Sequence, residues 1–421
     1  MTTPDAGHFA TWSIAALVVS GVVVRPWRVP EWAWALIGAG VLVLSGLLPW
    51  RDAAEAVGKG LDVYLFLAGM MLLSELARRE GLFEFLAAHA VHLANGSPRR
   101  LFLLAYAIGT VVTVFMSNDA TAVVLTPAVY AAARQARAPP LPYLFACAFI
   151  ANAASFVLPI SNPANLVIFG RQLPPLAQWL ALFAVPSVVA VVATYATHRV
   201  LQRGALRGTI ASRIPIPTLS RAGATTGYGI VVVAIALLVA SFQGIPLGWP
   251  TLIATGLVAT IIHVGKREAP FATLRHVSWG VLPLVAALFV LVEGLQYTGV
   301  VERLVALLHA ASDRSVTAAT WGTGISLALA SNLINNLPMG LITGSAVNGA
   351  DVGMLVRSAA TIGIDLGPNL SVTGSLATIL WLTAIRREGE HVSAWTFLRL
   401  GAVVMPVALL LAMASLFLMP H

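Results

Sequence analysis

The chain has 421 residues, of which 58% are hydrophobic and 10% are charged, and its mean hydropathy is +0.86. Soluble globular domains carry about 25% charged residues, so this composition excludes a soluble protein and makes lipid the solvent of the chain. The formal net charge of +8 comes mainly from arginine in the connections. Without aromatic interleaving or a soluble domain, that charge does not indicate nucleic-acid binding.

Long apolar segments begin near the amino terminus and recur along the chain. Residues 9–24 follow no basic residue and precede no small-residue cleavage site, so we expect a membrane helix there rather than a signal peptide. Residues 32–48, 228–242 and 402–419 are uncharged over lengths that cross or nearly cross a bilayer. Because backbone amides in hydrocarbon must bond within the chain, these segments are expected to be helices. Roughly ten to twelve such segments predict an all-α polytopic protein of the cell (inner) membrane.

The first polar interruption is Ser117-Asn118-Asp119, which separates the apolar segments 101–115 and 120–133. An ionisable residue at this depth is a functional candidate by default, either as a proton carrier or as a cation ligand. The alternative is that Asp119 caps the half-helix that starts at Ala120. We therefore expect a discontinuous helix with a carboxylate at its break.

A second interruption follows some forty positions later, where Ser161-Asn162-Pro163-Ala164-Asn165 divides the short apolar stretch 156–169. An interrupted stretch of this length suits a re-entrant hairpin that enters and leaves on one side of the membrane. Such backbone is tolerated only where it faces protein or a water-filled cavity. The sequence therefore predicts that the hairpin tip and the helix break lie together.

An arginine-rich segment divides the chain near its middle. Arg203, Arg207 and Arg213 lie between Arg199 and Arg221, and no acid accompanies them. The positive-inside rule predicts that this loop is cytoplasmic. We therefore divide the chain into an amino-terminal membrane repeat (1–199), a cytoplasmic linker (200–222) and a carboxyl-terminal membrane repeat (223–421).

The second half repeats the plan of the first. Asn335-Asn336-Leu337-Pro338 interrupts the segments 318–329 and 339–346, and Pro338 enforces the break. Thr373-Gly374-Ser375 interrupts the stretch 366–381, as in a second re-entrant hairpin. Three residues near the start of each half are separated by the same interval of 218 positions, namely Glu75, Gly81 and Glu84 from Glu293, Gly299 and Glu302. We expect two structural repeats, in the inverted arrangement common for such sites.

Polar residues at both breaks and both hairpin tips are the candidate substrate ligands. Their amides and hydroxyls supply donors and acceptors that suit a small ligand with several hydroxyls. The alternative is that they satisfy backbone groups freed by the breaks or bond their own turns. The candidates are Asn118, Ser161, Asn162, Asn165, Asn335, Asn336, Thr373, Gly374 and Ser375.

Several other chemistries are not expected. Cys147 is the only cysteine, which rules out intrachain disulfides and thiolate clusters. The chain has no Walker loop for nucleotide hydrolysis, and its histidines lack the spacing of a zinc site. We therefore expect no metal, no cofactor and no enzymatic activity.

The carboxyl-terminal motifs resemble a known family. Ile-Gly-Ile-Asp-Leu-Gly-Pro-Asn (362–369) and Gly-Ser-Leu-Ala-Thr-Ile-Leu-Trp-Leu (374–382) closely resemble the signature near the end of ArsB-type arsenite-efflux permeases. The breaks at 117–119 and 334–338 match that family's Asn-Asp and Asn-Asn-x-Pro breaks, and residues 149–165 resemble its first hairpin. The likeness runs from about residue 10 to 418. The breaks are shared with a wider ion-transporter superfamily, which includes NhaD-type sodium/proton antiporters and dicarboxylate/sodium symporters.

The resemblance implies a secondary transporter that exports arsenite and antimonite from the cytoplasm in exchange for protons. It also implies a soluble arsenical-stimulated ATPase as an optional partner. Both substrates are mostly neutral trihydroxy acids at cytoplasmic pH, which need donors and acceptors rather than a paired cation. A single cysteine cannot form an arsenic trithiolate.

Two departures from the family pattern bear on proton coupling. Asn152 stands where the family is expected to have Asp, and Asn369 stands where it often has Lys. Asp119 and Asp365 therefore remain the acidic candidates for coupling. Two alternatives stay open: a sodium-coupled antiporter or anion symporter of the same superfamily, whose Na⁺ would bind unwound carbonyls and Asn, Ser or Thr oxygens, and a channel for neutral hydroxy solutes, which needs no titratable residue.

Overall fold

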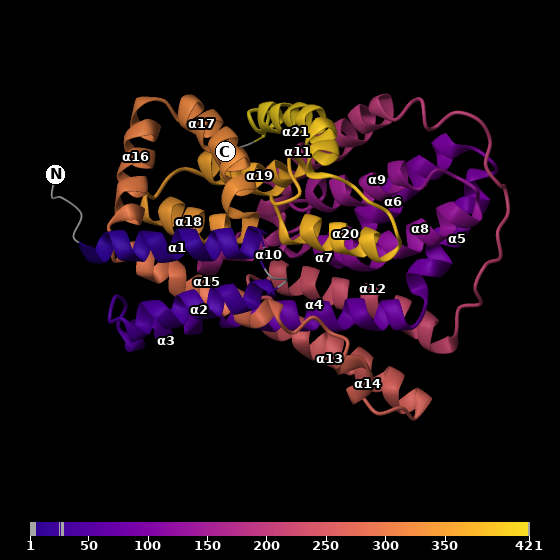
Figure 1. Cartoon of the computed structure of the whole chain (residues 1–421), viewed down its shortest axis with the longest axis horizontal. Coiled ribbons are helices and arrows are strands. Elements are labelled where there is room, and N and C mark those ends of the chain that lie inside the picture. Colours follow the sequence, from indigo (N-terminus) through magenta and orange to yellow (C-terminus); the bar gives the residue numbers. More distant parts are fainter. Residues whose placement is uncertain (1–5, 25, 27–28, 420–421) are drawn as a thin grey trace.

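The computed structural model describes residues 6–24, 26 and 29–419, and over these residues it contains helices and no strand (Figure 1). The predicted all-α fold is confirmed. The α-helices are α1 (Ala6–Val24), α2 (Glu31–Leu44), α3 (Trp50–Lys59), α4 (Leu61–Arg79), α5 (Leu82–Ala94), α6 (Pro98–Phe115), α7 (Asn118–Ala120), α8 (Thr126–Gln135), α9 (Leu141–Ala153), α10 (Pro163–Phe169), α11 (Leu176–Leu201), α12 (Arg221–Phe242), α13 (Gly248–Lys266), α14 (Phe271–Leu274), α15 (Val281–Gln296), α16 (Val300–Arg314), α17 (Val316–Ile334), α18 (Asn336–Gly349), α19 (Met354–Leu366), α20 (Leu376–Arg387) and α21 (Ala394–Leu416).

Within the described part of the chain, five helices are long and apolar enough to cross a membrane: α6, α11, α12, α13 and α21. Two bent pairs raise this number to seven if each pair is one span, α3 with α4 at 49° and α15 with α16 at 75°. The ten to twelve hydrophobic segments expected from the sequence exceed this number, because that count also took in apolar helices too short to cross a membrane alone. Among these are α2, α5 and α9.

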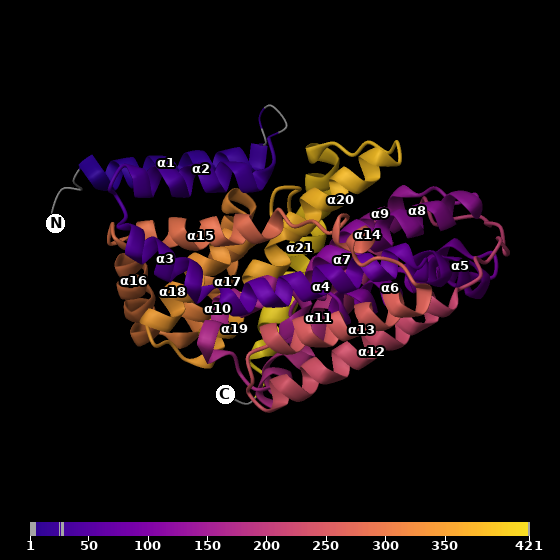
Figure 2. The ribbon, with the colours of Figure 1, turned by 90° about the horizontal axis from the view of Figure 1, so that it is seen from below.

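The two halves of the chain pack into one body. Helix α11 packs along α21, α4 along α13 and α2 along α15, so each of these contacts joins the first half to the second. Figure 2 shows α12 and α13 side by side along one edge of the molecule. Aromatic side chains strengthen the junction: the Phe145 ring centroid lies 5.3 Å from that of Trp381 and 5.8 Å from that of Phe397. The interior is therefore shared by both halves.

The linker between α11 and α12 is bound to the ends of other helices. The Ile210 amide donates to the Gly96 carbonyl at 3.1 Å, and the Ala211 amide donates to the Ala136 carbonyl at 2.8 Å. A ring nitrogen of His92 lies 2.7 Å from the carbonyl oxygen of Ile214. The linker thus lies on the ends of α5, α6 and α8, with its arginines exposed.

Helices α17 and α19 approach each other closely through small residues. A Cβ atom on Gly363 would lie 2.3 Å from the Gly324 carbonyl oxygen, and one on Gly367 would lie 2.4 Å from that of Ala328. Real Cβ atoms do not tolerate such distances, so only glycine permits this approach. Because α19 leads directly into the second hairpin, this contact sets the position of the hairpin.

We predict that Gly363→Ala destabilises the protein, because its new methyl group must push α19 away from α17. Overpacking of this kind costs about 1–3 kcal/mol, and thermal melting of the detergent-purified protein should show a clearly lower melting temperature. The matched control is Gly322→Ala on α17, where a Cβ atom would meet no atom within 4 Å. Equal melting temperatures for the two variants would contradict the predicted role of this contact.

Candidate functional site

The first break lies between α6 and α7. Helix α6 ends at Phe115, and a new helix begins at Asn118 and continues through a π-helical turn (Thr121–Leu125) into α8. The Ser117 hydroxyl accepts a hydrogen bond from the Ala120 amide at 3.3 Å, so Ser117 and not Asp119 caps this helix. The Thr113 and Thr121 hydroxyls share a 2.8 Å hydrogen bond across the break. Such π-helical turns often occur at functional sites.

The first hairpin consists of α9, a turn and the short helix α10. The Asn162 Oδ1 atom caps α10 by accepting from the Ala164 amide at 3.0 Å. Ser161 donates to the Val114 carbonyl at 3.1 Å, which ties the hairpin tip to the end of α6. Asn165 donates to the Ser155 carbonyl at 2.8 Å. Ser161 and Asn165, both fully buried, therefore hold the hairpin in place.

The second break is bound to the second hairpin. Asn335, between α17 and α18, has φ +80°, and its Oδ1 atom accepts from the Leu337 amide at 3.3 Å. Its side-chain amide donates to the Thr373 carbonyl at 3.2 Å, and the Asn336 backbone amide donates to the Gly374 carbonyl at 2.8 Å. Polar groups freed by the break are thus satisfied by the tip of the hairpin.

Asn332 also binds the second hairpin, although we did not predict it from the sequence. Its side-chain amide donates to the Gly367 carbonyl at 2.9 Å, and its Oδ1 atom accepts from Ser371 at 2.7 Å. The Thr373 hydroxyl donates to the Asn332 backbone carbonyl at 2.9 Å. The sequence feature that could have identified Asn332 is an amide within the apolar segment of α17, one helical turn before the break.

The two breaks and the two hairpin tips meet around a small cavity. Its volume is about 20 Å³, which is close to the minimum that holds one water molecule. Helices α4 and α15 contribute Leu67 and Val281 to its lining. The other lining residues are Asn118, Asp119, Asn162, Pro163, Asn336, Leu337, Leu376 and Ala377. The structure therefore brings together the four regions that the sequence singled out.

The predicted ligands divide into two groups. Asn118, Asn162 and Asn336 line the cavity together with Asp119. The Asn118 Oδ1 atom is buried and has no hydrogen-bond partner among the residues that the structure describes. The remaining candidates do not line the cavity: Ser161, Asn165, Asn335, Thr373, Gly374 and Ser375. Their described contacts hold the breaks and hairpins together.

Two features set the electrostatics around the cavity: the amino termini of helices and one carboxyl group. Helices α7, α10, α18 and α20 all begin at or beside lining residues, and a helix amino terminus carries partial positive charge. Asp119 lines the cavity and is half-buried. Among the residues that line it, there is no Lys, Arg or His. The site therefore contains one carboxylate, three amides and no fixed cation.

Asp365 lies behind the cavity and is fully buried on α19. Its Oδ1 atom accepts a hydrogen bond from the side-chain amide of Asn162 at 2.7 Å. Within the described residues its Oδ2 atom has no partner. Asp365 therefore connects to the cavity through Asn162, a residue that itself lines the cavity.

The two departures from the family pattern lie next to each other. The Asn152 side-chain amide donates to Asn369 Oδ1 at 3.0 Å and to the Thr378 hydroxyl at 3.2 Å. The Ser375 hydroxyl in turn donates to Asn152 Oδ1 at 3.1 Å. Ser375 thus belongs to a buried network that joins α9 to α20. The Asn369 side-chain amide donates to the Phe149 carbonyl at 3.0 Å, so both amides are satisfied without a charge.

Comparisons with known proteins agree with this architecture. Relatives named arsenical pump membrane protein include one from Yersinia enterocolitica, 28% identical over 404 residues, which covers 91% of this chain and 92% of the relative. Another, from Escherichia coli strain K12, is 29% identical over 406 residues with the same coverage. These similarities confirm the resemblance found in the sequence.

Solved structures support the fold. The YdaH transporter of Alcanivorax borkumensis aligns with a TM-score of 0.61 at 15% identity, covering 98% of each chain. MtrF of Neisseria gonorrhoeae, described as illuminating a class of antimetabolite efflux pumps, aligns with a TM-score of 0.52 at 12% identity. It covers all of this chain and 96% of its own. The fold is thus that of a membrane transporter.

A family model described as citrate transporter (CitMHS) matches residues 15–364, which include both helix breaks and the first hairpin. The relatives are transporters rather than enzymes. Because the match extends over most of the chain, this protein belongs to the citrate transporter family of multi-pass membrane transporters.

Proposed function

We propose that this secondary transporter exports arsenite, and also antimonite, from the cytoplasm in exchange for protons. The observation that carries the proposal is the lining of the central cavity, where three amides and one carboxylate face each other without a fixed cation. Amides donate and accept hydrogen bonds, as a neutral trihydroxy acid requires. The arsenical pump membrane proteins among its relatives support the same substrate.

An anion symporter coupled to sodium is the second candidate. Four helix amino termini near the cavity favour an anion, and the family description names citrate. However, the carboxyl group of Asp119 lines the cavity beside these termini, where an anionic substrate would meet a second acidic group. The buried Arg357, which would suit a carboxylate, is bound by Asn348 at 3.1 Å, by the Val352 carbonyl at 3.1 Å and by Gln172. We therefore favour a neutral substrate.

We further propose that Asp119 carries the exchanged proton. It is the one carboxylate among the lining residues, so substrate binding there competes directly with its proton. Asp365 responds to the same event, because Asn162 both lines the cavity and donates to Asp365. Loading of the site is thereby linked to the packing of α19.

The architecture that we propose has two inverted repeats, residues 1–199 and 223–421, joined by a cytoplasmic linker at 200–222. In support, Gly81 and Gly299 precede α5 and α16, and both have φ +73°. Each half also contains a broken helix followed by a hairpin. The breaks and hairpins form the mobile unit and the other helices the scaffold, with alternating access in the inner membrane.

Transport into everted membrane vesicles tests the proposed function. We expect accumulation of arsenite under an imposed proton gradient alone, because export from the cell corresponds to uptake by everted vesicles. A sodium gradient alone should have no effect, and citrate should neither accumulate nor compete. Sodium-dependent uptake of citrate without arsenite uptake would instead establish the symporter.

Asp119→Asn removes the proposed proton carrier while it keeps the shape of the side chain. We expect proton-driven arsenite uptake to fall to the level of vesicles without the protein, with the melting temperature little changed. The matched control is Asp313→Asn, at an exposed carboxylate that pairs with His309 far from the cavity lining. Full activity of Asp119→Asn would show that this carboxylate has no part in coupling.

Asn336 and Asn335 are adjacent but should have different roles. Asn336→Ala removes an amide that lines the cavity, so we expect the KM for arsenite to rise about two- to tenfold, the value of one hydrogen bond. Asn335→Ala removes the side-chain bonds to Leu337 and Thr373, so its main effect should be a lower melting temperature. Vesicle kinetics and thermal melting separate the two effects. The reverse pattern would move the binding role from Asn336 to Asn335.

A further inference from the structure

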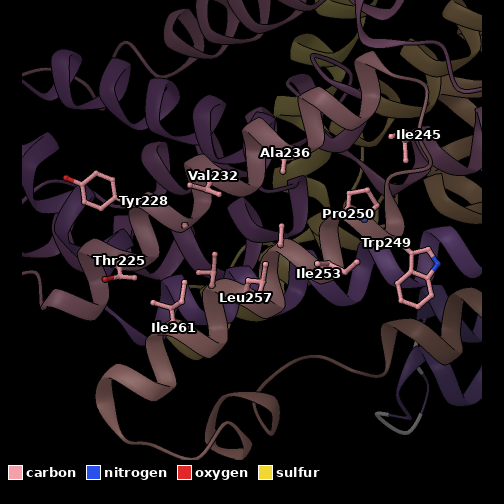
Figure 3. Close-up of a pocket in the computed structure, with 13 residues that line it drawn as sticks. Thr225, Tyr228, Val232, Ala236, Ile245, Trp249, Pro250, Ile253, Leu257 and Ile261 are labelled. Carbon is pink, nitrogen blue, oxygen red and sulfur yellow. The ribbon is translucent and has the colours of Figure 1, made fainter.

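A long apolar groove lies between α12 and α13, away from the central cavity. Its volume is about 740 Å³, and Figure 3 shows aliphatic side chains of both helices along it. Val232 and Ala236 come from α12, and Ile253 and Leu257 come from α13. From Trp249 to Ile261 the lining of α13 extends about 18 Å at 1.5 Å per residue. One leaflet of a bilayer has about 15 Å of hydrocarbon, so the groove matches the length of one acyl chain.

One end of this groove carries positive charge. Glu80 accepts hydrogen bonds from Ser220 at 3.4 Å and from Lys266 at 2.9 Å, so the start of α12 and the end of α13 lie at the same point. Arg221 and Arg267 are the next residues on each side, and both are exposed. Thr225, one turn beyond Arg221, lines the groove. The two arginines therefore flank the end of the groove.

These two arginines are free to bind an anion. The acids in this region already have partners, because Glu80 pairs with Lys266 at 2.9 Å and Glu268 pairs with Arg79 at 3.3 Å. In the described part of the chain, neither Arg221 nor Arg267 forms an ion pair. Both nearby acids are bound to other basic side chains, so no ion pair neutralises these two arginines in the described part of the chain.

We propose that the groove and the two arginines form a binding site for one phospholipid with an anionic headgroup. An acyl chain occupies the apolar groove, and the phosphate lies between Arg221 and Arg267. A zwitterionic lipid offers the same acyl chain but adds its own cation beside the two arginines. The two arginines therefore select an anionic headgroup. Free phosphate has no acyl chain to fill the apolar groove, so the site favours a membrane lipid over phosphate. The lipid would link α12 to α13, the hairpin that packs on α4.

Native mass spectrometry of the detergent-purified full-length protein tests this site with phosphatidylglycerol and phosphatidylcholine. We expect tighter binding of phosphatidylglycerol, and we expect Arg221→Gln and Arg267→Gln each to weaken it about fivefold, the usual effect of one basic residue near a lipid surface. Ala236→Trp fills the groove and should lower the binding of both lipids. Inorganic phosphate at the same concentration should not compete.

Matched controls place the effect at the groove. Arg207→Gln removes the same single charge from the linker, and Ala196→Trp adds the same bulk at an exposed position of α11. Both controls should bind phosphatidylglycerol as the unmodified protein does. Equal binding of the two lipids by the unmodified protein would overturn the proposal, as would equal losses in the linker variant and in the groove arginine variants. Because Arg221 and Arg267 are exposed, their variants should fold even if Ala236→Trp does not.

Discussion

The structure depends on one constraint: backbone groups released by a helix break inside a membrane protein must find partners within the protein. At the second break, the Asn336 amide and the Asn335 side chain obtain those partners from the carbonyls of Gly374 and Thr373. At the first break, Ser161 of the hairpin reaches the Val114 carbonyl. Each hairpin is therefore a structural requirement of the break in its own half. The polar centre exists because groups freed by a break at this depth must bond within the protein.

A second set of contacts joins the two hairpins to each other. Asn162 donates to Asp365, and Asn152 donates to Asn369. These bonds connect the amino-terminal hairpin with α19 and the segment after it, so neither hairpin is an independent unit. In the Asn152–Asn369 pair, two amides occupy positions where the resemblance leads us to expect Asp and Lys. A neutral pair needs no counter-charge in a buried position, since each amide donates and accepts. Both departures are thus accommodated together.

The sequence predicted the class of fold, both breaks and both hairpins, because polar residues in an apolar chain are costly and therefore conspicuous. The sequence did not distinguish the amides that line the cavity from those that hold the breaks and hairpins together. Asn162 and Asn165 lie on one tip, yet Asn165 bonds to Ser155 while Asn162 borders the cavity. Asn162 is the N-cap of α10, whereas Asn165 lies within that helix, so their partners depend on tertiary packing around the tip. Asn332 was overlooked for the same reason, since its partners come from a hairpin 35 to 41 residues later in the chain.

The small size of the central cavity has a consequence for the cell's energy balance. A space of about 20 Å³ has room for about one water molecule, so it cannot contain a continuous file of hydrogen-bonded water. Protons move rapidly along such files, and a file through an exchanger would short-circuit the membrane potential. Here the tips and the apolar residues Leu67 and Val281 line the narrow space beside the carboxylate. Under the proposed proton exchange, the packing of the tips would therefore also limit idle proton current.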